Sequence, residues 1–519
     1  MKKYYLLSLL ALAPIANAEE QTVTNIYTDV VLSDPNNILK PDISDASIYK
    51  VGSLEGDAFT GNISANTNLN LSYTVDYLPI SETNDGNQLN NKTAFSIAND
   101  ITANNIKINA TVEDNVWVSN ILVSSDSNTR KITASNFSIT VGTQTYNPWF
   151  NFRDIELNLS GNFTIKLADG FSWKVVRVGT GDEVWNIGGK LLFDCKGNLR
   201  QPELRIQNFE FTATGGIHFE NQSNESRIII QASNYNETNI AIGGLNNSYQ
   251  TVLAVQAANA KDVNLRFTNS ESYDALVSFM IRDTNETGKF NITMDATQTK
   301  GKQTLRFGTH DDSKFIDNVN VTNRNISDVE VLNGTLEIGM YEGMRANSLY
   351  VYGDNAAFSS TSNTEGKIGN SYFTTVELGK GELVFDYSID EGNDLIVISS
   401  DDNLDATITN EGKFIVSNLN DAKIVLESEN DIKAWLESGD TIDPFTIITF
   451  EGTNLTSEQI ANLNVDAGEG LSAILSAIET DGVITGIQAT ITLAVPEPAT
   501  VAGIFGALAL AFAIYRRRK

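Results

Sequence analysis

The chain has 519 residues, of which 41% are hydrophobic and 19% are charged, and its formal net charge is −29. A surface this acidic repels nucleic acid and anionic lipid at long range, so neither is expected as a partner. The chain has enough apolar and β-branched residues to exclude a disordered tract, and its length suits either two or three domains or one long repetitive array.

The first 18 residues have the pattern of a secretory signal peptide. Lys2 and Lys3 form a basic start, residues 4–12 are apolar, and Ala-Asn-Ala at residues 16–18 is a small-residue cleavage site. We therefore expect signal peptidase to cut after Ala18. The mature chain is then exported to the cell surface or beyond it.

The body of the chain divides into two regions. Residues 19–95 lack a sustained period and are expected to form an irregular N-terminal region or cap, with a turn signal at residues 84–87. Residues 96–493 instead contain short alternating stretches, such as Val263-x-Leu265-x-Phe267, bounded by Asn, Asp and Gly. Alternation places every second side chain on one face, so each stretch is predicted to be a half-buried strand. The fold class is therefore all-β.

The spacing of these strands favours a β-solenoid, with an array of β-sandwiches as the alternative for part of the chain. Gly334, Gly381 and Gly412 each precede an alternating apolar run. A glycine can adopt a positive φ at a corner and lead one strand over its predecessor. No strict period survives counting, so the repeat is degenerate.

Two short helices are predicted near residues 431–463. Thr456 and Gln459 have the spacing of a capping box that opens a helix through about Leu463, and residues 431–436 form another turn or two. A helix here is expected to cover the last apolar layer of a solenoid and to block edge-to-edge aggregation. Residues 482–493 are then predicted to be the final strand.

One part of this region resembles a known class of surface protein. The Asn-Gly-Thr-Leu-Glu-Ile corner at residues 333–338, the strand at 445–450 and the helical segment at 455–460 are similar to the passenger region of autotransporter-type adhesins. The likeness spans residues 331 to about 465 and rests on pattern. It implies a right-handed parallel β-helix.

The C-terminal residues 494–519 have three parts. A Pro-Glu-Pro motif precedes the uncharged segment 499–515, which is near the lower limit for a transmembrane helix, and a basic cluster ends the chain. The basic cluster favours a cytoplasmic end by the positive-inside rule, while the prolines keep the motif extended. The residues concerned are Pro496, Glu497 and Pro498 in the motif, and Arg516, Arg517, Arg518 and Lys519 in the cluster.

This order of motif, apolar helix and basic tail resembles the PEP-CTERM sorting signal. The resemblance covers about the last 25 residues and implies processing by an exosortase-type membrane enzyme. The mature protein is thereby expected at the cell surface or outside the cell, at least transiently anchored by the helix 499–515. A plain single-pass tail anchor is the alternative.

A search for reactive or metal-binding groups finds little. Cys195 is predicted to be a small buried hydrophobe, because a nucleophilic thiol needs a histidine partner and the chain has only His218 and His310. His218 is expected to be a solvated or hydrogen-bonded strand residue, and His310, beside two aspartates, is the better functional candidate. The sequence contains no nucleotide-loop or zinc motif, so we expect no cofactor and no metal site.

Carbohydrate is the ligand class that the sequence leaves open. Trp149, Trp173 and Trp185 lie within a short span and are candidates for stacking on sugar rings, although tryptophans in strands more often belong to the core. We predict a non-enzymatic structural or adhesive surface protein, with polysaccharide or extracellular matrix as its partner. The alternative is a carbohydrate-active β-helix enzyme, a polysaccharide lyase or glycoside hydrolase, which requires converging carboxylates.

Overall fold

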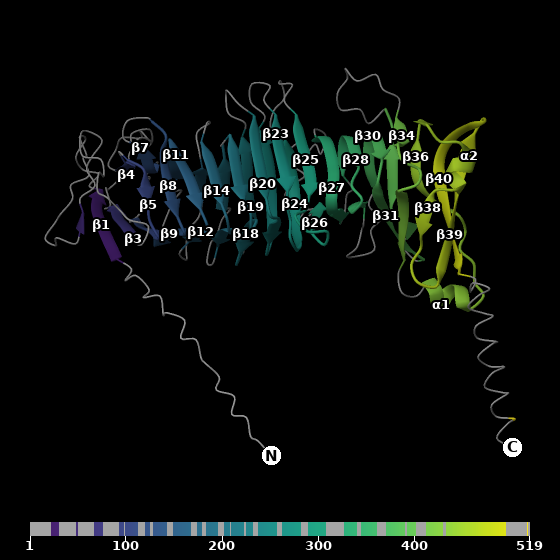
Figure 1. Ribbon diagram of the computed structural model, residues 1–519, viewed down its shortest axis with the longest axis horizontal. Helices are drawn as coiled ribbons and strands as arrows, with labels where there is room; N and C mark the ends of the chain where they lie inside the picture. The colour runs from purple at the N-terminus through teal and green to yellow at the C-terminus, as the bar shows by residue number, and fades with distance from the viewer. Residues whose placement is uncertain are drawn as a thin grey trace, which may run out of the picture.

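The computed structural model is a long array of β-strands that runs from β1 near one end to β40 near the other (Figure 1). Its strands form three rows, here called sheets A, B and C, and two short helices lie near the end of the chain. The structure describes residues 22–30, 48–49, 67–75, 93–97, 99–112, 120–124, 128–142, 149–167, 174–178, 183–195, 202–207, 209–222, 225–231, 237–256, 262–281, 289–307, 326–339, 344–360, 370–389, 392–400, 412–428, 432–494 and 516.

Sheet A contains nine strands in parallel order. In spatial order they are β2 (Ile48–Tyr49), β1 (Thr22–Val30), β3 (Thr67–Val75), β6 (Asn105–Val112), β9 (Asn136–Gly142), β12 (Phe163–Leu167), β15 (Leu191–Asp194), β18 (Ile217–Glu220) and β21 (Leu245–Asn247). Because β1 and β3 pair over nine residues, regular strands extend into the region 19–95 that was expected to be irregular.

Sheet B runs beside it along the array. Its strands are β4 (Thr93–Ile97), β7 (Asn120–Ser124), β10 (Trp149–Arg153), β13 (Lys174–Val178), β16 (Pro202–Ile206), β19 (Ser226–Gln231), β22 (Gln250–Gln256), β24 (Ser272–Ile281), β26 (Lys302–Phe307), the second half of β27 (Ile326–Gly339), β29 (Ala356–Ser359), β31 (Gly381–Ser388), β32 (Gly392–Asn393), β35 (Ala422–Ser428) and β38 (Asn464–Asp466).

Sheet C completes the coil. Its strands are β5 (Ile101–Thr102), β8 (Arg130–Ala134), β11 (Ile155–Leu159), β14 (Val184–Ile187), β17 (Glu210–Ala213), β20 (Thr238–Ile242), β23 (Val263–Phe267), β25 (Phe290–Asp295), the first half of β27, β28 (Arg345–Val351), β30 (Asn370–Leu378), β33 (Leu395–Ile398), β34 (Lys413–Val416), β36 (Phe445–Phe450), β37 (Gly452–Thr453), β39 (Leu471–Thr480) and β40 (Val483–Leu493).

The chain coils through these sheets in a fixed sequence. Strands β10, β11 and β12 lie in sheets B, C and A, and each pairs in parallel with its counterpart three strands later. Sandwich strands are antiparallel, so the sandwich alternative is wrong for these coils. The all-β prediction is confirmed, and the long parallel sheets are compatible with a β-helix.

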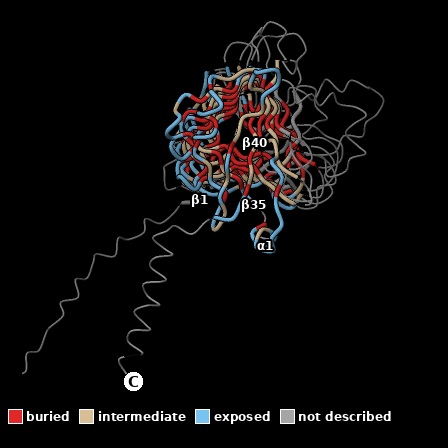
Figure 2. Tube along the Cα trace, turned by 90° about the vertical axis from the view of Figure 1, so that its right-hand side faces the viewer, coloured by how far each residue is buried: buried red, intermediate tan, exposed pale blue. Residues whose placement is uncertain are grey.

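The core lies inside the coils, where the buried residues of Figure 2 gather. Strand β23 shows the expected alternation, because Val263, Leu265 and Phe267 are buried while the residues between them reach the surface. Near β10–β14 the interior is aromatic, and the rings of Phe152 and Trp185 meet edge to face at 5.2 Å. Hydrophobic burial along the whole array therefore stabilises the stacking of the coils.

Among the described residues, sheet A ends at β21, and the later coils contribute strands to sheets B and C. Strand β27 shows the change, since one continuous strand pairs with β25 in sheet C and then with β26 in sheet B. Gly334 lies at the corner between these halves with φ 80°, and Gly381 adopts φ 100° at the start of β31. Both confirm the predicted glycine corners.

Gly412 differs from these two. Its φ lies outside the left-handed region, and a Cβ at this position would lie 2.6 Å from the carbonyl oxygen of Ile398. Close approach of neighbouring backbones therefore explains this glycine, and the predicted positive φ is wrong here.

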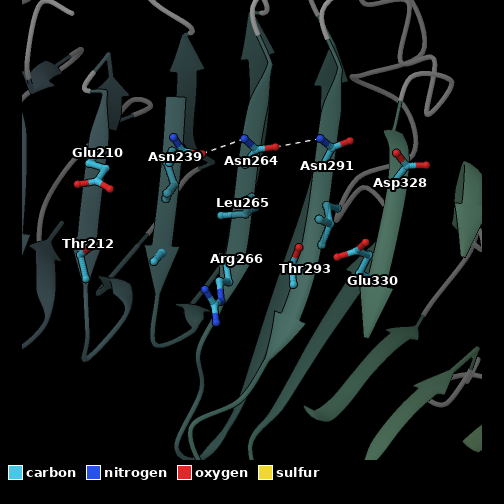
Figure 3. A pocket seen from close by; sticks show the side chains of 13 residues that line it. Glu210, Thr212, Asn239, Asn264, Leu265, Arg266, Asn291, Thr293, Asp328 and Glu330 are labelled. Atoms are coloured by element: carbon cyan, nitrogen blue, oxygen red, sulfur yellow. Dashed lines mark hydrogen bonds between the residues drawn. The ribbon is translucent and has the colours of Figure 1, made fainter. Parts of the chain in front are cut away.

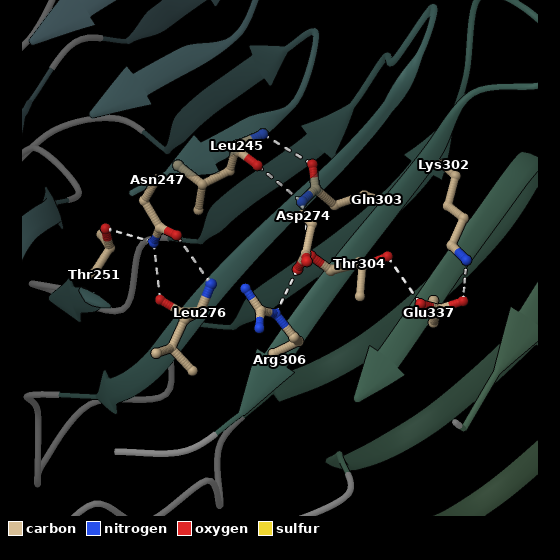
Figure 4. A network of polar contacts seen from close by, with 10 residues as sticks. All are labelled: Leu245, Asn247, Thr251, Asp274, Leu276, Lys302, Gln303, Thr304, Arg306 and Glu337. Carbon is tan, nitrogen blue, oxygen red and sulfur yellow. Dashed lines mark hydrogen bonds and ion pairs between the residues drawn. The ribbon is translucent and has the colours of Figure 1, made fainter. Parts of the chain in front are cut away.

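Side-chain amides close the open edge that the end of sheet A leaves (Figure 4). Gln303 accepts a hydrogen bond from the Leu245 amide at 2.8 Å and donates to its carbonyl at 3.1 Å. Asn247 accepts from the Leu276 amide at 3.1 Å and donates to its carbonyl at 2.9 Å. The Gln303 carboxamide therefore takes the place of the backbone partner that a further strand of sheet A would supply. Asn247 instead links β21 of sheet A to the backbone of β24 in sheet B.

The C-terminal end of the array changes from parallel to antiparallel pairing. Strand β40 pairs antiparallel with both β36 and β39. Helix α2 (Ser457–Ala461) packs on β39, and helix α1 (Ile432–Glu437) contacts β40. The capping box of Thr456 and Gln459 is present in full, so both predicted helices and the predicted final strand are confirmed.

Candidate functional site

A polar groove crosses the outer face of sheet C (Figure 3). It extends over β17, β20, β23, β25 and β27 and has a volume of about 420 Å³. Alternation explains its position, since the residues that face outward on these strands are polar while their neighbours fill the core. The outward-facing residues on its floor and rim include Glu210, Thr212, Asn239, Asn264, Arg266, Asn291, Thr293, Asp328 and Glu330.

Three asparagines form a ladder along the groove, one on each of three successive coils. The Asn264 amide donates to Oδ1 of Asn239 at 2.8 Å, and the Asn291 amide donates to Oδ1 of Asn264 at 2.9 Å. Asn239 in turn donates to Glu237 at 3.2 Å. This chain of hydrogen bonds fixes the side chains against the sheet and gives the groove a rigid, regularly spaced floor.

The charged groups of the groove are mainly carboxylates. Glu210 lies at one end, and Asp328 and Glu330 lie together at the other end on β27. Arg266 is the cation of the lining, and it pairs with Asp295. Three carboxylates and one guanidinium give the lining a formal charge of −2, so it attracts cations and accepts hydrogen bonds.

Next to the carboxylate end, two tyrosines form an aromatic platform on the same face. Tyr350 pairs directly with Glu330 in the ladder between β27 and β28, and Tyr352 follows two residues later. Their rings stack with centroids 5.6 Å apart and planes 22° apart, and Tyr352 is 38% exposed. We call the groove together with Tyr350, Tyr352 and Glu377 the sheet C track.

The sequence explains how the Tyr352 ring can lie against Gly379 of the next coil. A Cβ on Gly379 would lie 2.9 Å from the Tyr352 ring, so only a residue without a side chain leaves room for it. Burial, then the charge of Glu377 and a hydrogen bond to that carboxylate, raises the pKa of Tyr352 far above its usual value. The hydroxyl therefore remains protonated and acts as a donor.

The carboxylates at the two ends of the groove, and the two on β27, do not have the arrangement of a hydrolytic pair. Glu210 and Glu330 are separated by four strand spacings, or about 19 Å, which is too far for a hydrolytic pair. Asp328 and Glu330 lie two residues apart on one strand and face the same side. Inverting hydrolysis needs carboxyl groups on opposite sides of the sugar, and a flat sheet surface presents both from one side.

The structure corrects the predicted tryptophan site in one respect. Trp185 is completely buried and donates to the carbonyl of Ile155 at 2.8 Å, so it belongs to the core and no sugar ring reaches it. Trp149 lies in β10, but its side chain is outside the described residues, as is all of Trp173. An aromatic pair on the outer face of sheet C is instead formed by the half-buried Tyr350 and the exposed Tyr352. The sequence feature that indicates this pair is the alternating Leu-Tyr-Val-Tyr run at residues 349–352, in which the two aliphatic residues face the core.

The remaining candidates of the sequence search are structural or lie outside the described residues. Cys195 is buried, as predicted. His218 is also buried and hydrogen-bonds through Nε2 to the Gly215 carbonyl at 2.8 Å, and burial lowers its pKa. This confirms a hydrogen-bonded strand residue. His310 is outside the described residues, within which no cluster of three or more metal-ligating side chains occurs.

The predicted sorting elements fall almost entirely outside the described residues. This applies to Ala18, to the motif Pro496, Glu497 and Pro498, to the segment 499–515, and to Arg517, Arg518 and Lys519. Arg516 is described and is exposed. Within the described part of the chain, no helix has the length and apolar character needed to cross a membrane.

Comparison with known proteins does not assign the chain to a family. No protein-family model matches the chain, and no curated protein matches it either. Its function is therefore inferred from its residues and geometry.

Proposed function

We propose that this chain is an exported surface protein with a structural or adhesive role, sorted through its C-terminal signal. The observation that carries the proposal is the position of that signal directly behind a capped rod. Strand β40 ends at Leu493, and the Pro-Glu-Pro motif begins at residue 496. The motif thus follows the folded array closely enough to hold the array near a membrane.

The form of the array supports the same role. We propose that its coils form a right-handed parallel β-helix, in which neighbouring coils stabilise one another over the whole length. The antiparallel hairpin and α2 close one end, which protects the last parallel strands from pairing with other chains. A long array with a net charge of −29 is suited to project from a surface into the surroundings.

Cell fractionation tests the sorting part of the proposal. We expect the wild-type chain to be digested by protease added to intact cells, and replacement of Pro496, Glu497 and Pro498 by alanine to leave an unprocessed chain in the membrane fraction. The control is Pro444→Ala, which changes an exposed proline outside the motif. A wild-type chain protected inside the cell, or unchanged processing of the triple variant, would contradict the proposal.

A further inference from the structure

The sheet C track has a repeat that a linear polymer can follow. Its outward-facing residues recur once per coil, from β17 through β28 to β30, at the strand spacing of about 4.8 Å. Six such spacings give a track about 29 Å long. A pyranose ring in an extended chain advances by a similar distance, so successive rings of a linear glycan laid across the strands meet equivalent positions of successive coils.

The polar and charged groups of the track favour some linear glycans over others. The Asn239–Asn264–Asn291 ladder is already hydrogen-bonded within itself, while the carboxylates at its ends accept hydrogen bonds from a ligand. Glu377 adds a fourth carboxylate beside Tyr350. A polymer of uronic acids is therefore repelled, and hydroxyl and ammonium groups are attracted.

The tyrosine platform adds a requirement for flat apolar faces. Tyr350 lies between Glu330 and Glu377, as the cross-strand pairs show, and the ring of Tyr352 stacks on that of Tyr350. A pyranose ring offers C–H groups to an aromatic face and its polar substituents to groups beside it. An ammonium group there also gains from the aromatic rings and the two carboxylates.

We propose that the sheet C track binds a linear polysaccharide with free amino groups, of the glucosamine type. The inference rests on the proposed surface role and assigns that surface its ligand. Stacking on Tyr352 holds a sugar ring, and Glu330 and Glu377 bind the ammonium groups beside it. The ladder keeps the floor straight, so that the polymer lies along the axis of the coils.

Calorimetric titration of the full chain with a glucosamine hexamer tests this assignment. We expect binding by the wild type, weaker binding of the N-acetylated hexamer, and none of a uronic acid hexamer. Tyr352→Ala and Glu330→Gln should each raise the Kd roughly tenfold. The matched controls are Trp435→Ala, which removes an exposed aromatic from α1, and Glu427→Gln, which neutralises an exposed carboxylate on β35; both should bind as the wild type does.

Oligolysine separates glycan recognition from general attraction to an acidic surface. We expect it to bind with no dependence on Tyr352, since it offers charge without a sugar face. The assignment would be overturned if the glucosamine hexamer did not bind at all. It would also be overturned if the track variants kept wild-type affinity, or if the control variants lost as much affinity as the track variants. Thermal melts followed by circular dichroism establish that each variant is folded. The proposed sorting and export are tested separately, by surface exposure on cells, so a failure to bind the glycan would not contradict them.

Discussion

Gln303 hydrogen-bonds through its carboxamide to both backbone groups of Leu245, a residue 58 positions earlier in the chain. The side chain thereby occupies the place of the strand that sheet A lacks beyond β21 (Figure 4). An open parallel edge would otherwise begin here, in the middle of the array. The buried Gln303 side chain thus satisfies backbone groups of β21 at the edge where the described strands of sheet A end.

Removal of this carboxamide should destabilise the fold. In Gln303→Ala, the amide and carbonyl of Leu245 lose their buried partner, which should lower the free energy of unfolding by about 3 kcal/mol. Denaturant unfolding measures the loss. Gln298→Ala, in an exposed position nearby, is the control and should change stability by less than about 0.5 kcal/mol. Equal stability of the two variants would refute the role assigned to Gln303.

A methyl group at Gly379 should disturb the platform without unfolding the rod. The added Cβ lies 2.9 Å from the Tyr352 ring and must displace it. We expect Gly379→Ala to weaken binding of the glucosamine hexamer roughly three- to tenfold while costing about 1 kcal/mol of stability or less. Gly452→Ala is the control, since the nearest atom to its Cβ is 3.9 Å away. Unchanged affinity of Gly379→Ala would show that the ring position does not matter.

Glu225 should make stability fall as the pH rises. Burial raises the pKa of Glu225 from 4.5 to about 7 despite the nearby Arg227. The folded state therefore binds a proton more tightly than the unfolded state, and the stability gained from protonation, full below pH 4.5, is lost as the pH rises to about 7. As the pH rises through this window, the free energy of unfolding of Glu225→Gln should increase relative to that of the wild type, by up to about 3 kcal/mol. Glu220→Gln changes an exposed position and is the control, and its free energy of unfolding should depend on pH in the same way as that of the wild type.

Glu451 should have the opposite dependence. Burial favours its neutral form, but hydrogen bonds from Ser400, Gly412 and Ser399 outweigh this and lower its pKa to about 2. Its stabilisation is therefore present above pH 4.5 and is lost as the pH falls toward 2. We expect Glu451→Ala to lower the free energy of unfolding by about 1 kcal/mol at pH 7, because solvent screens this exposed carboxylate, and by clearly less at pH 2. A pH-independent difference would contradict the hydrogen-bonding role.

Local patterns in the sequence predicted local structure well. Alternation at residues 263–267 identified β23, and the spacing of Thr456 and Gln459 identified the start of α2, because both signals depend on neighbours in the chain. Stacking of the coils depends on pairs about 25 to 30 residues apart. The Asn239–Asn264–Asn291 ladder and the edge closure by Gln303 therefore have no local signal.

The sequence did not identify the residues of the candidate site, and carbohydrate as its ligand class stays a prediction. Trp185 was an attractive sugar contact by residue type, but its place on the inward face of β14 puts it in the core. Tyr350 is part of the candidate site because Glu330 and Glu377 occupy its row on the strands on either side, and Tyr352 stacks on it. Register between strands determines such rows, and a single sequence with a degenerate repeat does not specify it.

The central claim is that this rod binds glycans at the surface without cleaving them. Incubation of the purified full chain with a panel of polysaccharides, scored both for retention and for new reducing or unsaturated ends, tests it most directly. We predict retention on an amino-sugar polymer with no new ends. Formation of new ends would contradict the account and establish the chain as a carbohydrate-active enzyme.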